Sequence, residues 1–353
     1  MPDGGLFITL YDENTLLLYL ARGVYGQHMA PTYDKPSSHS AFYRTLADYS
    51  AARRGTHVFF FLKRKLYYGG QIVGSDKYGA FYINGQTSLM GKNHDVPLVW
   101  DESPREAYTP TDAPGVFDAG QNRGVKSQPF LIQFEDRLDL AGHYIISDQL
   151  YFELGEFPYP LPANTIAGMG FCTLTPGETS VIMRQLRDNS AGAVEPVSPE
   201  SVYLQGEPVP FSPAMGVATV EEAHPESHLE ASIIANPGLL PGHLHPNGAV
   251  VCRQVPISPL KPKGMDKADV CYFTDDLIRD GTIPNVILEL KIRTAGKAAA
   301  KQVTRYMKWL HDRLGTEAYQ IRIIVYAPSF TSTFWDYVPD IYTSQVIAER
   351  FSS

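Results

Sequence analysis

Short apolar runs separated by turn residues dominate the first half of the chain, which predicts strands more often than helices. A basic turn at 63–65 joins two of these runs into a hairpin, and the pair Gly69–Gly70 predicts a bulge in its second strand. A helical pattern covers 40–50. The predicted strands are residues 6–10, 15–20, 57–62, 66–74, 129–134 and 143–147.

The second half alternates helical and strand patterns. Residues 226–236 carry an apolar stripe at helical spacing and stop at Pro237, and residues 295–314 form the strongest amphipathic helix of the chain. The predicted strands of this half are residues 249–255, 268–273, 285–293 and 320–325. This order predicts a mixed α/β (α+β) protein.

The run 285–293 is apolar except for one acid and one base near its centre. Because side chains alternate along a strand, Glu289 and Lys291 point to the same face. A carboxylate and an ammonium group side by side at a sheet surface form either a salt bridge or a catalytic pair, and the strand alone favours neither.

Length and composition indicate the number of domains and the cellular compartment. A chain of 353 residues with 44% hydrophobic residues is long enough for two packed domains. Three cysteines without CxxC spacing argue against a disulfide framework or a zinc site and for a reducing compartment. The chain carries no pattern of a signal peptide and no apolar run near the roughly 20 residues of a membrane helix. We expect a cytoplasmic protein with no membrane partner.

Composition also predicts the domain boundaries. Residues 189–221 are rich in Pro with few large apolar residues in sequence, which is typical of a linker. We therefore predict a β-rich domain over 1–188 and a second domain over 222–353. The net charge of −8 does not suit a protein that coats nucleic acid, but a local basic surface can coexist with it.

The predicted hairpin resembles part of the PUA-like superfamily, which includes the EVE, YTH and ASCH domains. The similar residues are 55–61, an apolar strand, and 67–74, a strand with glycines. The resemblance implies that the N-terminal domain is a mostly-β barrel that binds a modified or flipped base. The residues that recognise the base are not identified. The aromatic candidates, by composition only, are Tyr25, Tyr43, Tyr67, Tyr82 and Trp100.

The order of elements in the second half resembles the PD-(D/E)xK nuclease core, in which a Glu-bearing helix precedes strands with Asp and Glu-x-Lys and a helix with Gln-x3-Tyr. Within that superfamily, residues 226–326 are similar to the catalytic domain of NucS (EndoMS) type endonucleases and their restriction-enzyme relatives. The catalytic residues that this resemblance implies are Glu226, Asp269, Glu289, Lys291, Gln302 and Tyr306.

The resemblance also implies a metal site. Asp269, Glu289 and Glu226 are the predicted ligands of Mg²⁺, with Mn²⁺ as a substitute, because hard cations prefer carboxylate oxygens. Asp266 is the alternative for the aspartate, and Glu230 the alternative for the helix glutamate.

Lys291 is expected to orient or deprotonate the attacking water, and Gln302 and Tyr306 to position the nucleophile or the phosphate. A basic stripe on the last helix is expected to hold the DNA backbone. Its residues are Lys297, Lys301, Arg305 and Lys308.

Three functions follow from these resemblances. The first is a Mg²⁺-dependent DNA endonuclease for defence, a modification-dependent restriction enzyme whose N-terminal domain selects the target. The alternatives are a mismatch- or structure-specific repair endonuclease of the NucS type and a non-catalytic DNA-binding protein on a nuclease fold. Double-stranded DNA is the expected partner, and a homodimer is expected by analogy with nucleases that cut both strands. The sequence gives neither the base modification nor the cleavage position.

Overall fold

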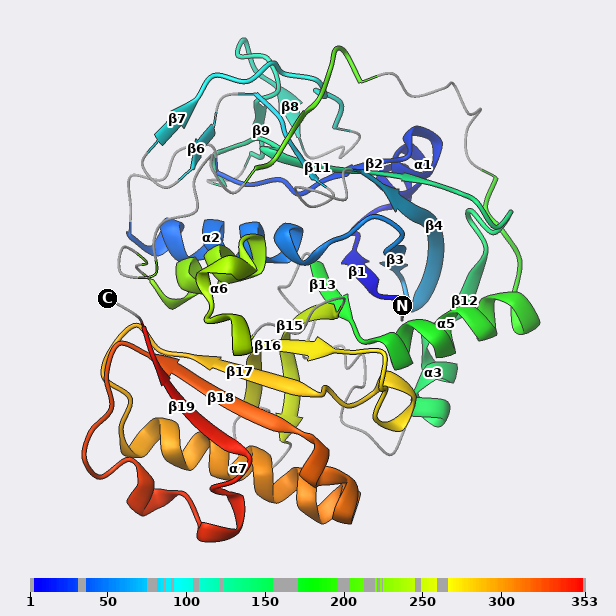
Figure 1. Cartoon of the computed structure of the whole chain (residues 1–353). Coiled ribbons are helices and arrows are strands. Elements are labelled where there is room, and N and C mark those ends of the chain that lie inside the picture. The colour runs from blue at the N-terminus through cyan, green and yellow to red at the C-terminus, as the bar shows by residue number, and fades with distance from the viewer. Residues whose placement is uncertain are drawn as a thin grey trace.

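The protein has a mixed α/β fold, as predicted, with one large sheet in its N-terminal half and a second sheet in its C-terminal half (Figure 1). Within the described residues, no helix combines the length and apolar character needed to cross a membrane. The computed structural model describes residues 3–30, 36–74, 81–85, 87–89, 92–103, 108–120, 123–154, 171–195, 204–212, 220, 223, 225–244, 249–258 and 266–351.

The N-terminal sheet has nine strands among the described residues and the order β13-β1-β3-β4-β11-β5-β14, with β12 paired to β4 and β2 to β11. β1 and β3 are parallel, and the other pairs are antiparallel. The strands are β1 (Gly5–Thr9), β2 (Val24–Gly26), β3 (His57–Leu62), β4 (Lys65–Val73), β5 (Phe81–Ile83), β11 (Phe130–Glu135), β12 (Tyr144–Ile146), β13 (Phe171–Leu174) and β14 (Val209–Pro210).

Helices and two small sheets accompany this sheet. The helices are α1 (Glu13–Arg22), α2 (Pro36–Ala51), α3 (Ser147–Leu154) and α5 (Pro176–Asn189). The strands of the small sheets are β6 (Thr87–Leu89) with β7 (Lys92–His94), and β8 (Thr109–Pro110), β9 (Phe117–Asp118) and β10 (Val125–Lys126). Whether this half is a PUA-like barrel stays a prediction.

The predicted hairpin and its bulge are confirmed. Val58 pairs with Gly70 and the next residue, Phe59, pairs with Tyr68, so Gly69 has no partner of its own. Gly70 has φ +149°, and a Cβ there would lie 2.5 Å from the carbonyl oxygen of Glu135. The glycine is therefore required both by the backbone conformation and by the close approach of β11.

The prediction of a strand at 15–20 is wrong, because these residues lie in helix α1. Asp12 caps the helix by accepting a hydrogen bond from the Thr15 amide at 2.7 Å. Gly23 ends it in the left-handed conformation, and its N–H donates to the carbonyl oxygen of Tyr19. The leucines of this segment have neither a clear helical nor a clear strand period. The capping residues Asp12 and Gly23 are therefore the sequence features that indicate a helix.

The C-terminal sheet has five strands among the described residues and the order β15-β16-β17-β18-β19. The first three are antiparallel, and β17, β18 and β19 are parallel. These strands are β15 (Val250–Ser258), β16 (Asp266–Phe273), β17 (Val286–Leu290), β18 (Arg322–Ala327) and β19 (Val346–Arg350). β15 and β16 extend beyond the predicted strands 249–255 and 268–273, and residues 259–265 between them lie outside the described residues. β19 was not predicted.

Alternate residues of β17 and β18 enter two different cores. Ile287 and Ile323 pack with Met307 of α7 (Lys297–Leu314), which covers one face of the sheet. Leu288 and Ile324 face the other way, toward α6 (Glu226–Ala235) and the N-terminal half. Both helices were predicted, and the fully buried central strand explains the continuous apolar run.

The two halves share the core that lies between them. One apolar cluster includes Leu6 and Phe60 from the N-terminal sheet together with Leu229 of α6 and Leu288 of β17. α2 and α6 lie against each other between the sheets (Figure 1). β14, which falls in the predicted linker, pairs with β5. The boundaries at 188 and 221 stay predictions, and 196–203, 213–219 and 221–222 lie outside the described residues.

Candidate active site

The site forms where strands β16 and β17 stop pairing. The antiparallel register runs from Tyr272 opposite Val286 to Val270 opposite Leu288, so the next residues, Asp269 and Glu289, come side by side. Asp269 then uses its Oδ2 to accept a hydrogen bond from the Leu290 amide at 2.8 Å. The aspartate side chain thus takes the place of a backbone acceptor at the point where the two strands separate.

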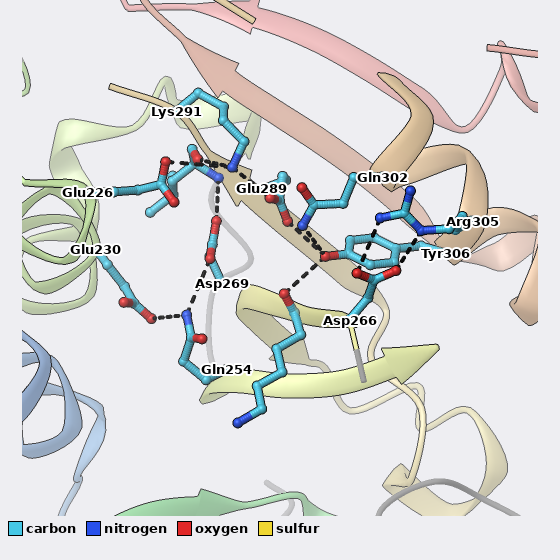
Figure 2. A network of polar contacts seen from close by, with 12 residues as sticks. Glu226, Glu230, Gln254, Asp266, Asp269, Glu289, Lys291, Gln302, Arg305 and Tyr306 are labelled. Atoms are coloured by element: carbon cyan, nitrogen blue, oxygen red, sulfur yellow. Dashed lines mark hydrogen bonds and ion pairs between the residues drawn. The ribbon is translucent and has the colours of Figure 1, made fainter. Parts of the chain in front are cut away.

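Lys291 lies among the carboxylates of this site (Figure 2). Its Nζ donates to Glu289 Oε1 at 2.7 Å and to the Leu290 carbonyl oxygen at 2.7 Å, and it lies 3.6 Å from Glu226 Oε2. The alternation of side chains along the strand had predicted that Glu289 and Lys291 share a face, and the contact confirms it. Glu289 and Lys291 thus form a salt bridge. Lys291 stays partly exposed at the strand ends, with 22% of its side-chain surface accessible.

Gln302 and Tyr306 hold Glu289 from α7. Gln302 Nε2 donates to the Tyr306 hydroxyl oxygen at 2.6 Å, and that hydroxyl lies 3.2 Å from Glu289 Oε2 and 2.9 Å from the Lys267 carbonyl oxygen. Tyr306 is fully buried. Its hydroxyl therefore acts on the site through Glu289, the carboxylate that it contacts.

Burial and like charge dominate the electrostatics. Burial, and then the negative charge of Glu289, raise the pKa of Asp269 well above its ordinary value. Burial also raises the pKa of Glu289, and Lys291 opposes that rise. Burial alone would lower the pKa of Lys291, but the charges of Glu289 and Asp269 outweigh burial and raise it. The charges of Glu289 and Asp269 thus stabilise the ammonium form of Lys291.

The two alternative acids are engaged elsewhere. Asp266 accepts from Arg305 Nε at 2.6 Å and from Arg305 Nη2 at 3.2 Å. Glu230 accepts from Arg253 Nε at 3.0 Å and from Arg253 Nη2 at 2.8 Å. Of the residues considered from the sequence, Asp269 rather than Asp266 lies beside Glu289, and Glu226 rather than Glu230 faces Lys291 (Figure 2).

The predicted DNA-binding stripe divides into two parts on α7. Lys297 and Lys301 lie over the ring of Tyr337, with Nζ 4.9 Å and 5.6 Å from the ring centroid. Lys308 is exposed. Arg305 forms the bidentate ion pair with Asp266, which leaves it less available to a phosphate than the three lysines. The role of the stripe in binding DNA stays a prediction.

Sequence reasoning missed three residues next to this site. Arg253 and Gln254 of β15 contact Glu230, and Arg253 also donates to Asp48 of α2 at 2.5 Å. An arginine followed by an amide in the apolar run 249–255 was a signal, since charged residues are rarely fully buried unless paired. Asp48, 205 positions away from Arg253, gave none.

The aromatic candidates for base capture do not all belong to one cluster, although Tyr25 and Tyr67 share the large core and Tyr43 packs against it. Tyr25 lies in the large core beside Tyr49, whereas Trp100 belongs to a separate cluster with Val99. Tyr43 stacks on His228 of α6 with 4.2 Å between ring centroids. Tyr67 packs against Tyr144, and Tyr82 pairs with Leu131 in the sheet.

The site suits a hard divalent cation by the chemistry of its donors. No group of three or more His, Cys, Asp or Glu side chains in the described part of the chain is arranged to hold a metal ion. Mg²⁺, however, usually keeps several waters and is bound through one or two carboxylates. Asp269 and Glu289 supply two such carboxylates, side by side at the end of the β16–β17 pairing.

No family model and no curated protein matches the chain. Among solved structures, a repair endonuclease from Pyrococcus abyssi is 16% identical, covers 93% of this chain and 98% of its own, and has a TM-score of 0.21. EndoMS in a complex with double-stranded DNA is 13% identical, covers 94% and 98%, and has a TM-score of 0.24. EndoMS in apo form is 13% identical, covers 94% and 99%, and also has a TM-score of 0.24. At these TM-scores the function has to be argued from the site itself.

Proposed function

We propose that the protein is a metal-dependent endonuclease that hydrolyses phosphodiester bonds in double-stranded DNA. The observation that carries this proposal is the placement of Asp269 and Glu289 side by side at the end of the β16–β17 pairing, with the Lys291 ammonium 2.7 Å from Glu289. Two buried carboxylates and a lysine at a strand end are suited to a hard cation and to the charge of a phosphate group.

A bound Mg²⁺ would supply Lewis acidity, lowering the pKa of a coordinated water and neutralising charge on the scissile phosphate. Asp269 and Glu289 would hold it. Lys291 provides a fixed positive charge that offsets negative charge on the phosphate, and the one N–H that does not donate to Glu289 or the Leu290 carbonyl would orient a water. Tyr306 keeps Glu289 in place from below the sheet, and the Leu290 amide does the same for Asp269.

Glu226 acts from the side of the site opposite α7. Its carboxylate lies 3.6 Å from Lys291 and keeps 42% of its side-chain surface accessible. It can therefore bind a water of the metal shell or an entering ligand without losing a buried contact. The exposed lysines of α7 would hold the DNA backbone through phosphate contacts, which carry no sequence information.

For the target we place a mismatch- or structure-specific repair role ahead of modification-dependent restriction. The restriction role needs an aromatic pocket for a modified base, and two of the candidates, Tyr25 and Trp100, are buried in different clusters. In either role, cleavage of both strands would call for two copies of the chain on one duplex.

The test is cleavage of a panel of duplexes that are unmodified, methylated, hydroxymethylated or mismatched, with Mg²⁺ and with EDTA. We expect Mg²⁺-dependent cleavage that is fastest on mismatched or branched DNA, and none in EDTA. The variant Glu289→Gln should bind the same DNA without cutting it. Faster cleavage of modified DNA would favour the restriction role, and DNA binding without cleavage by the unaltered protein would favour a non-catalytic function.

A further inference from the structure

Two consecutive residues of strand β15 reach the same carboxylate. Side chains of neighbouring residues in a regular strand point to opposite faces. Yet Arg253 Nε lies 3.0 Å and Gln254 Nε2 lies 3.4 Å from Glu230 Oε1. The cause is the backbone of Gln254, whose φ is +52°. The left-handed conformation turns the Gln254 side chain back toward the side on which Arg253 lies.

That conformation is unfavourable for a residue with a side chain. Gln lacks the short polar group that lets Asn and Asp adopt it more readily, and glycine would adopt it without strain. Arg253 pairs with Val270 and Val255 with Ala268, so the register of β15 with β16 continues unchanged across Gln254, which has no pair of its own. Strained backbone held inside a regular element is characteristic of functional positions.

The Gln254 amide bridges two acids. Its Nε2 lies 3.2 Å from Asp269 Oδ1 and 3.4 Å from Glu230 Oε1, so each N–H has its own carboxylate (Figure 2). Asp269 is then held at both oxygens, at Oδ1 by Gln254 and at Oδ2 by the Leu290 amide. These two donors come from the strands on either side of β16, and together they fix the plane of the carboxylate.

Glu230 is itself anchored from the N-terminal half. Arg253 bonds both of its oxygens and extends Nη1 to Asp48 of α2, and all three side chains have 10% or less of their surface accessible. A continuous chain of hydrogen bonds thus runs from α2 through Arg253, Glu230 and Gln254 to Asp269.

We propose that Gln254 is the positioning residue of this site, which orients Asp269 for metal binding and connects its orientation to the N-terminal half. The inference rests on the proposed function, because it assigns Asp269 to a metal. Partners that orient a metal ligand from outside typically change metal affinity or activity by about 10- to 100-fold when they are removed.

The test uses two substitutions in the full chain. Gln254→Gly removes the amide and also relieves the backbone strain, so its thermal midpoint should fall by no more than that of the glycine control variant. Gln254→Met keeps the approximate size of the side chain and removes the two N–H donors without adding a carboxylate that could itself bind the cation. The control is Asp139→Gly, which relieves a left-handed residue (φ +53°) at an exposed position away from the site.

Binding of Mn²⁺ is measured by calorimetry without DNA, and kcat and KM for cleavage are measured with Mg²⁺. We expect both Gln254 variants to bind Mn²⁺ about tenfold or more weakly and to lose kcat with little change in KM. Asp139→Gly should match the unaltered protein in all of these quantities. A purely structural role of Gln254 would instead lower the thermal midpoint of Gln254→Gly and leave Mn²⁺ affinity unchanged.

The outcomes separate this inference from the proposed function. Normal Mn²⁺ affinity and kcat in both variants would overturn the role of Gln254 and leave the nuclease proposal standing. Weakened Mn²⁺ binding in a protein that cuts no DNA would support the role of Gln254 and overturn the nuclease proposal. An unaltered protein that binds no Mn²⁺ would overturn both.

Discussion

Lys291→Ala should destabilise the protein in the absence of a divalent cation. The Lys291 ammonium lies 2.7 Å from Glu289, a carboxylate with 1% of its side-chain surface accessible. Exposed ion pairs contribute about 0.2–1 kcal/mol, whereas removing one partner of a buried pair costs about 3–5 kcal/mol because the other charge is left buried. Since Lys291 keeps 22% of its surface accessible, we expect about 3 kcal/mol, the lower end of that range.

The free energy of unfolding is measured by urea denaturation in EDTA and again in Mg²⁺. Mg²⁺ should stabilise Lys291→Ala more than the unaltered protein, because the ion replaces the missing positive charge next to Glu289. Lys308→Ala removes an exposed lysine of α7 and serves as the control, with a change within about 0.5 kcal/mol. A Lys291→Ala protein as stable as the control in EDTA would refute the reasoning that Lys291 is the counter-ion of the site.

Three further predictions concern other contacts. Tyr306→Phe removes the hydroxyl that holds Glu289 and should lower kcat by about 10-fold or more in cleavage assays while circular dichroism stays unchanged. Arg253→Met leaves two buried carboxylates without their cation and should cost about 3–5 kcal/mol in urea denaturation. Glu178 has a pKa raised from 4.5 to about 7 by burial, so its neutral form is favoured in the folded chain and stability is lost as pH rises from about 4.5 through about 7. Glu178→Gln should avoid that loss and be more stable at pH 8 by up to about 3 kcal/mol, with no difference at pH 4.

Each of these has an outcome that would count against it. Unchanged kcat in Tyr306→Phe would mean that the Gln302 and Lys267 contacts of the hydroxyl serve packing only. A more stable Arg253→Met would show that burying the arginine costs more than its two ion pairs return. Parallel stability curves of Glu178→Gln and the unaltered protein between pH 4 and pH 8 would show that the Glu178 carboxylate ionises normally.

The parts of the site that follow from strand geometry were predictable. Alternation along a strand is sufficient to put Glu289 and Lys291 on one face. Helical spacing likewise puts Gln302 and Tyr306, which are four residues apart, on one face of α7. Both contacts form. The mixed α/β class also followed, because the helices and strands of the second half have distinct periods in the sequence.

The parts that depend on contacts between distant segments were not predictable. The ion pair of Asp48 with Arg253 joins two elements with no shared pattern, and the left-handed backbone of Gln254 occurs at a residue type that seldom adopts it. α1 was predicted as a strand because its leucines form a short run, although Asp12 and Gly23 are signals of a helix start and end. The secondary structure of such a short segment is predicted poorly from its own residues when the capping residues on either side determine it.

The apolar cluster shared by the two halves limits how this protein can be rebuilt. Leu229 and Leu288 of the C-terminal half pack in one core with Leu6 and Phe60 of the N-terminal half. A truncated chain beginning near α6 would expose this apolar face, and exposed faces of that kind promote aggregation. Exchange of the N-terminal half for another recognition module would therefore have to supply a new helix in place of α2, with an acid at the position of Asp48 to neutralise Arg253.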